Sequence, residues 1–128
     1  MSNDTVGAVC AVLLAVVFLL AAVTKLSGPT AWRAQAAALR VPSAVANVVP
    51  FVEAVLGALL LVQWQRHLVA WVAVAVLVAF TGLLALRLAH GERPACACFG
   101  SWSAAPIGPA TLLRNTAFIA LGVLAAAL

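Results

Sequence analysis

Four long apolar runs constrain the fold of this chain more than any other feature of its sequence. They cover residues 6–26, 43–64, 68–89 and 110–128 and carry few charged side chains. A helix of about 20 mainly apolar residues is long enough to cross a bilayer. The runs are continuous and lack the alternation that is typical of a transmembrane β-barrel. The sequence therefore predicts an all-α, up-and-down bundle of four transmembrane helices in a single domain, residues 1–128.

The composition excludes a water-soluble globule. Of the 128 residues, 66% are hydrophobic and 8% are charged, whereas soluble domains average about 45–50% apolar residues. The net charge of +4 fits basic side chains that flank membrane spans and contact anionic headgroups. We therefore expect a lipid bilayer as the partner of this basic chain and no nucleic acid.

The segment at 30–40, between the first two runs, predicts a short amphipathic helix lying in the membrane interface. Four of its residues recur at helical spacing: Trp32, Gln35, Ala36 and Leu39. A plain connecting loop is the alternative. We assign the tryptophans to two aromatic belts, with Trp64 and Trp71 on one face of the membrane and Trp32 and Trp102 on the other.

Polar residues inside the predicted spans gather in one half of the bilayer. They are Lys25, Glu53, Arg87, Arg114 and Asn115. Glu53 lies roughly 15 Å along its helix, where an ionised group costs several kcal/mol unless it is paired and faces the bundle interior. Lys25, Arg87 and Arg114 are its available partners. An ion pair between Glu53 and one of these cations would serve either to fix helix packing or to relay protons or hold a ligand. For Lys25 and Arg114 alone, we expect side chains that extend to the headgroups.

Two cysteines, Cys96 and Cys98, lie one residue apart in the loop that caps this half of the bundle. The cations nearby favour the reactive thiolate form; they are Arg87, His90, Arg93 and Arg114. A disulfide across a single intervening residue closes a small strained ring, and strained disulfides are the labile, oxidising ones. We therefore predict reversible disulfide chemistry, with inert thiols as the alternative.

Other uses of the cysteines are less well supported by the spacing. A closed zinc site needs four ligands, and only His90 lies near the pair, so we predict no metal; Cu(I) bound by two thiolates stays an alternative. Cys10 lies inside the first run, roughly 22 Å along the helix from Lys25. Since a disulfide needs Cα atoms within about 7 Å, Cys10 should pack as a small apolar residue and not pair with the loop cysteines.

The combination of these residues resembles the methylamine utilisation protein MauE family, within the wider DoxX-like group of small redox-associated membrane proteins. The resemblance is carried by Lys25, Glu53 and Arg87, by Cys96-Ala97-Cys98-Phe99-Gly100, and by Arg114-Asn115. It implies a role in maturing a disulfide-rich extracytoplasmic client, for MauE the small subunit of methylamine dehydrogenase, together with a thioredoxin-like partner. This chain departs from the family pattern after Arg87, where Leu88-Ala89-His90 precede the glycine.

Taken together, these features favour a thiol–disulfide relay in which Cys96 and Cys98 are the catalytic residues. Because no second cysteine pair lies near the loop, the relay needs an external thiol partner or a membrane quinone near Phe99 and Trp102. The quinone is suggested by analogy with other four-helix disulfide-forming membrane proteins. The alternatives are a non-catalytic scaffold for a redox enzyme and a small transporter or Cu(I)-handling protein that uses Glu53.

The orientation in the membrane is predicted differently by charge and by resemblance. Arg33, Arg40 and Arg93 outnumber Arg66 on the opposite side, and the positive-inside rule then places the dithiol loop in the cytoplasm. Disulfides persist in oxidising compartments, and the resemblance implies an extracytoplasmic loop. We favour the plasma (inner) membrane with the dithiol loop outside.

Overall fold

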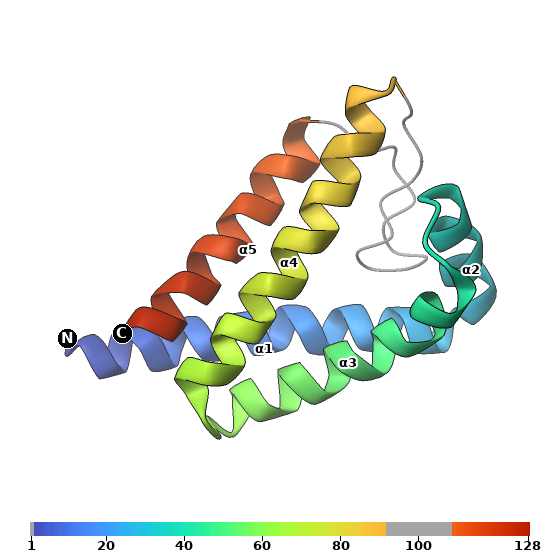
Figure 1. The fold of residues 1–128 in the computed structure, drawn as a ribbon. Helices are drawn as coiled ribbons and strands as arrows, with labels where there is room; N and C mark the ends of the chain where they lie inside the picture. Colours follow the sequence, from blue (N-terminus) through green and yellow to red (C-terminus); the bar gives the residue numbers. More distant parts are fainter. Residues whose placement is uncertain (1, 92–108) are drawn as a thin grey trace.

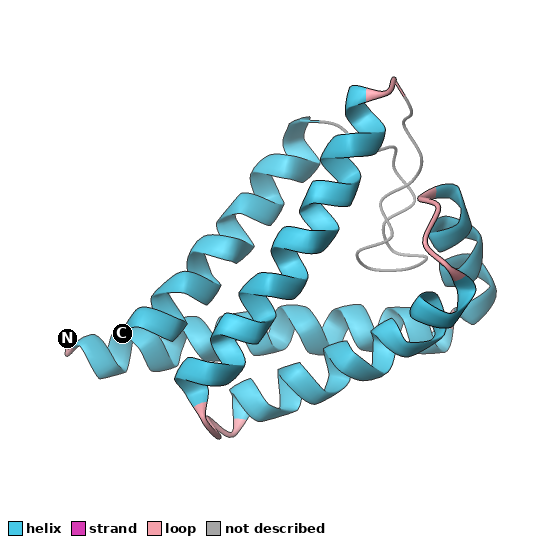
Figure 2. Cartoon of the chain, viewed as in Figure 1, coloured by secondary structure: helices cyan, strands magenta, loops and turns pink. Residues whose placement is uncertain are grey.

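Helices make up every regular element in residues 2–91 and 109–128, which are the residues that the computed structural model describes (Figures 1 and 2). They are α1 (Asn3–Ser27), α2 (Pro29–Ala38), α3 (Ser43–Leu61), α4 (Arg66–Ala89) and α5 (Pro109–Ala127). All but α2 are long and apolar enough to cross a membrane. The prediction of an all-α bundle with four spans and a short helix after the first is confirmed.

The ends of the helices follow from local chemistry. Gly28 ends α1, and Pro29 opens α2 at a position where the missing proline N–H is not needed. Helix α3 ends at Leu61, three residues before the boundary expected at residue 64. There Gln63 and Gln65 adopt left-handed φ values of 63° and 46°, and the Gln63 amide donates to the carbonyl of Leu60 at 2.9 Å, so the chain turns early.

The four spans form two helical hairpins that meet at one end. Helix α1 packs along α3, and α4 packs along α5, while both chain termini lie side by side (Figure 1). At that end Arg66 Nη2 approaches Asp4 Oδ1 to 3.7 Å. From there the α4–α5 hairpin diverges from the α1–α3 hairpin (Figure 1). The two hairpins therefore lie close together at the end that holds the chain termini.

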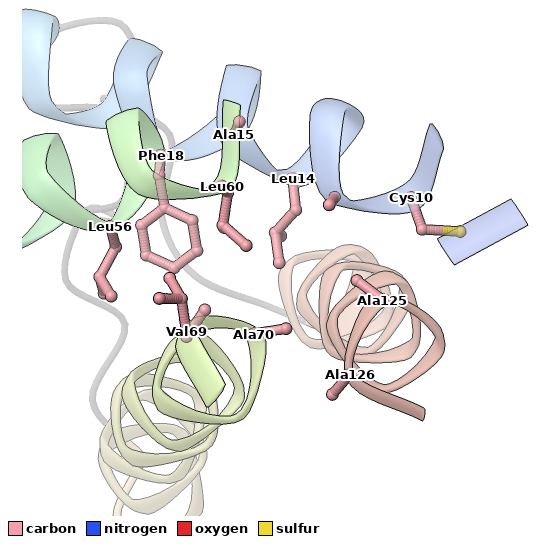
Figure 3. Packing of buried hydrophobic residues seen from close by; sticks show 12 residues of the cluster. Cys10, Leu14, Ala15, Phe18, Leu56, Leu60, Val69, Ala70, Ala125 and Ala126 are labelled. Carbon is pink, nitrogen blue, oxygen red and sulfur yellow. The ribbon is translucent and has the colours of Figure 1, made fainter. Parts of the chain in front are cut away.

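A first apolar cluster holds the hairpins together where they meet (Figure 3). Leu14 and Phe18 of α1 pack with Leu60 of α3 and with small residues at the start of α4 and the end of α5. These small residues are Ala70, Ala73, Ala125 and Ala126. Cys10 is buried in the same cluster, as expected for a cysteine that packs as an apolar residue.

A second apolar cluster joins α2 to the diverging ends of α3 and α4. Trp32, Ala36 and Leu39 are buried on one face of α2 and pack with Ala46 and Leu84. The helical spacing noted in the sequence therefore marks a face packed on the bundle. Trp32 is only 3% exposed, so its assignment to an aromatic belt is wrong, because protein and not lipid surrounds its ring.

The Trp32 indole N–H replaces a hydrogen bond that Pro50 removes from α3. Pro50 lies inside α3 and has no N–H to donate to the carbonyl four residues earlier, which is that of Ala46. Trp32 Nε1 donates to this carbonyl oxygen at 2.8 Å. The buried carbonyl is therefore satisfied by a residue of α2, and α3 continues through Pro50.

This arrangement predicts that Trp32 and Pro50 are coupled. Trp32→Phe keeps the ring but leaves the Ala46 carbonyl without its donor, which should cost about 1–3 kcal/mol. In a Pro50→Ala background the restored N–H supplies the missing bond, so the cost of Trp32→Phe should fall. A double-mutant cycle on the unfolding of the detergent-solubilised protein measures this coupling; additive effects would contradict it.

Candidate functional site

A buried ion pair lies at the centre of the candidate site. Lys25, in the last turn of α1, donates from Nζ to Oε1 of Glu53, near the middle of α3. The two side chains are 3% and 7% exposed. Of the three cations considered as partners for Glu53, Lys25 forms the contact. The expectation that Lys25 extends to the headgroups is wrong, because its ammonium turns inward to the carboxylate.

Two aromatic rings lie near the Lys25 ammonium. Nζ lies 4.9 Å from the centroid of the Trp32 ring and 6.0 Å from that of Phe80. At such distances the negative face of a ring attracts a cation, and more strongly where water is excluded. Trp32 thus donates a hydrogen bond to α3 through its N–H and contacts the Lys25 ammonium through its ring.

A cavity of about 300 Å³ opens beside the ion pair. All four spans contribute to its wall, and α2 adds Trp32. Among the described residues that line it, Lys25 and Glu53 are charged and Asn115 carries a polar amide, while the others are apolar or aromatic. The ion pair therefore faces an otherwise apolar space between the two hairpins.

Asn115 reaches this cavity from α5 and is 2% exposed. Its neighbour Arg114 is half-buried; Nη2 donates to Asn115 Oδ1 at 3.4 Å, and Cζ lies 5.8 Å from the Phe118 ring centroid. Phe118 also lines the cavity. Arg114 therefore contacts two lining residues without lining the cavity itself.

The structure thus gathers part of the predicted polar cluster. Lys25, Glu53 and Asn115 share one cavity, and Arg114 lies next to it. Arg87 is half-buried in the last turn of α4 and is not among the lining residues. Cys96, Cys98, Phe99 and Trp102 lie outside the described residues, so their roles stay predictions.

The described flanks of the dithiol loop lie at the end of the α4–α5 hairpin that is remote from the chain termini (Figure 1). Asn115 is about two turns into α5 from this end. Within residues 2–91 and 109–128, no group of three His, Cys, Asp or Glu side chains is placed to hold a metal.

Sequence reasoning missed the aromatic part of the site. Trp32 and Phe80 contact the ammonium, yet apolar rings in an apolar chain give little signal of such a role. One signal was present for Trp32. Pro50 leaves a carbonyl without its helical donor, and an indole N–H on the preceding amphipathic helix is a suitable replacement.

The burial of the ion pair predicts a characteristic pattern of unfolding free energies. Lys25→Met or Glu53→Gln alone leaves an unpaired polar or charged group, which should cost about 3–5 kcal/mol, whereas the double variant should recover much of that loss. Asp4→Asn is the matched control: the Asp4 side chain is 89% exposed and lies 3.7 Å from Arg66, so its loss should change stability by about 1 kcal/mol or less. Additive losses in the double variant would show that the two side chains do not interact.

The comparisons with known proteins address the whole chain. Residues 3–128 match the family described as Methylamine utilisation protein MauE. Searches among curated proteins and among solved structures gave no match. The family match confirms the resemblance suggested by the polar and cysteine motifs, and the four apolar helices agree with it. This multi-pass membrane protein therefore belongs to the MauE family.

Proposed function

We propose that this chain is a membrane-bound thiol–disulfide relay that supports disulfide formation in an extracytoplasmic client during methylamine utilisation. The observation that carries the proposal is the Cys96-Ala97-Cys98 pair within a chain that matches the MauE family over nearly its whole length. The Lys25–Glu53 pair is buried between α1 and α3, and its cavity is also lined by α4 and α5, the helices that flank this loop.

In the proposed reaction a client thiolate attacks the Cys96–Cys98 disulfide and forms a mixed disulfide, and a second client thiolate resolves it. The client gains a disulfide, and Cys96 and Cys98 gain two electrons and two protons. A thioredoxin-like partner in its disulfide form, or a quinone, then takes up these electrons and protons and restores the relay. The client is of the type of the small subunit of methylamine dehydrogenase.

The charged residues near the loop have supporting roles in this proposal. Arg114 and Arg87 lie in the helices that flank the loop, and positive charge there favours the loop cysteine thiolate that is released when the client attacks the disulfide. Lys25 and Glu53 satisfy each other, which favours a positioning role for the pair over a free transport site. We place the loop on the outer face of the plasma (inner) membrane, where disulfides persist.

The proposal predicts that both loop cysteines are essential. Cys96→Ala, Cys98→Ala and the double variant should abolish formation of disulfides in the client, whereas Cys10→Ala, in the apolar cluster, should leave it intact. The measurement is the thiol count of the client purified from cells that carry each variant. Full maturation with both loop cysteines replaced would instead favour the non-catalytic scaffold.

The sidedness of the loop is tested separately. A membrane-impermeant maleimide applied to intact cells should label Cys96 and Cys98 only after reduction, because the resting pair is a disulfide on the outer face. Labelling that requires broken cells would place the loop in the cytoplasm and contradict the proposed direction of oxidation.

A further inference from the structure

The cavity at the ion pair shares part of its wall with a second hollow at the surface of the bundle. The second hollow measures about 370 Å³ and shares Glu53, Val45, Val49 and Val76 with the first. It lies between α3 and α4, and its remaining described lining is apolar. Val45 and Val48 at its edge are 50% and 55% exposed. Taken together as one path, the two hollows extend from the buried charges to the exposed valines of α3 on the lipid-facing side.

The two hollows differ in chemistry along this path. At the inner end the Lys25 ammonium and the Asn115 amide supply N–H donors beside the rings of Trp32 and Phe80. Asn115 Oδ1 already accepts from Arg114, which leaves the amide NH₂ as the donor of that side chain. The outer end is formed by valines of α3 and α4. Such a path suits a molecule with a flat ring that accepts hydrogen bonds and with an apolar tail.

Charge argues against a phospholipid as the occupant. The Lys25 charge is balanced by Glu53, and among the described residues lining the two hollows no other side chain is charged. A phosphate headgroup would thus be buried without a free cation, at a high desolvation cost. Glu53 also lies roughly 15 Å along α3, deeper than the interface where headgroups reside.

We propose that this pair of hollows is a binding site for a lipid-soluble quinone. The quinone ring occupies the inner cavity beside Trp32 and Phe80, and its carbonyl oxygens accept from Lys25 and Asn115. The isoprenoid tail leaves between α3 and α4 over Val45 and Val49. A quinone carries only acceptors on its ring, which matches the donors that the cavity offers.

The inference deepens the proposed function and, as a redox step, rests on it. Oxidation of the Cys96–Cys98 dithiol to a disulfide releases two electrons and two protons, and reduction of a quinone to a quinol takes up the same number. A quinone in this site would therefore reoxidise the relay. Binding itself does not require the cysteines, so the two proposals can be tested apart.

The test uses tryptophan fluorescence of the full chain in phosphatidylcholine nanodiscs, titrated with decylubiquinone. One version retains Trp32 alone, and a second retains Trp71 alone, which is 51% exposed; the other tryptophans are replaced by Phe. Quenching of Trp32 should saturate, because the quinone ring binds beside it. Quenching of Trp71 should rise steadily with the quinone content of the bilayer, as expected for random collisions.

Variants of the cavity wall then locate the site. Ala79→Phe adds a ring to the cavity lining, and Ala75→Phe places the same ring one turn earlier on α4, outside the lining. Ala79→Phe and the double variant Lys25→Met with Glu53→Gln should each weaken the saturable quenching by about tenfold or more. Ala75→Phe should leave it unchanged. Thermal unfolding of each variant verifies that it is folded.

Three results would overturn the quinone site: non-saturable quenching of Trp32, equal affinities for the folded Ala79→Phe and Ala75→Phe proteins, or equally strong quenching of Trp32 by phosphatidylcholine brominated on its acyl chains. The last would show that the cavity holds a lipid chain. Cys96→Ser with Cys98→Ser should bind decylubiquinone as the parent does, so loss of the relay and loss of the quinone site are distinguishable.

Discussion

The Lys25–Glu53 ion pair is the interaction on which the arrangement of this bundle depends. A carboxylate near the middle of a transmembrane helix must be compensated inside the protein, and Lys25 does so from the end of α1. The contact joins the last turn of α1 to the middle of α3 inside the protein. The Trp32 ring of α2 packs against the Lys25 ammonium, and its N–H donates a hydrogen bond to the carbonyl that Pro50 leaves without a donor. The short helix α2 therefore contacts the ion pair and also satisfies the backbone of α3.

Because the two hairpins diverge, the ion pair lies beside a cavity between them. Small residues let the hairpins approach closely at the chain termini, where Ala70, Ala73, Ala125 and Ala126 are buried. At the other end α2 packs against α3 and α4 through Trp32, Leu39, Ala46 and Leu84. The cavity between these two clusters holds the Lys25, Glu53 and Asn115 side chains in an apolar wall. For this member of the MauE family, we propose that the interior supports the Cys96–Cys98 loop and holds the quinone that accepts the electrons of the dithiol.

The sequence alone was sufficient to predict the four spans and the helix between the first two. It also predicted that Glu53 is paired with a cation. It could not choose Lys25 over Arg87 or Arg114, because α1 is apolar on all sides and its sequence does not define an inward face. Trp32 was misassigned because a tryptophan near a span end suits lipid as well as a protein interior. The cavity depends on how far the hairpins diverge, and no local pattern encodes that. The roles of Cys96 and Cys98 stay predictions, since the structure describes residues 2–91 and 109–128.

The central claim is that the loop cysteines and the buried pair belong to one site, and proximity mapping tests it most directly. A benzoyl-phenylalanine placed at Ala97, between the two cysteines, would be activated in membranes and its crosslinks mapped by mass spectrometry. The same residue at Val62, in the turn that follows α3, is the control for the opposite end. We predict crosslinks from position 97 to the Lys25–Trp32 segment or to the first turns of α5. Crosslinks confined to the end of the bundle that holds the chain termini would contradict the claim.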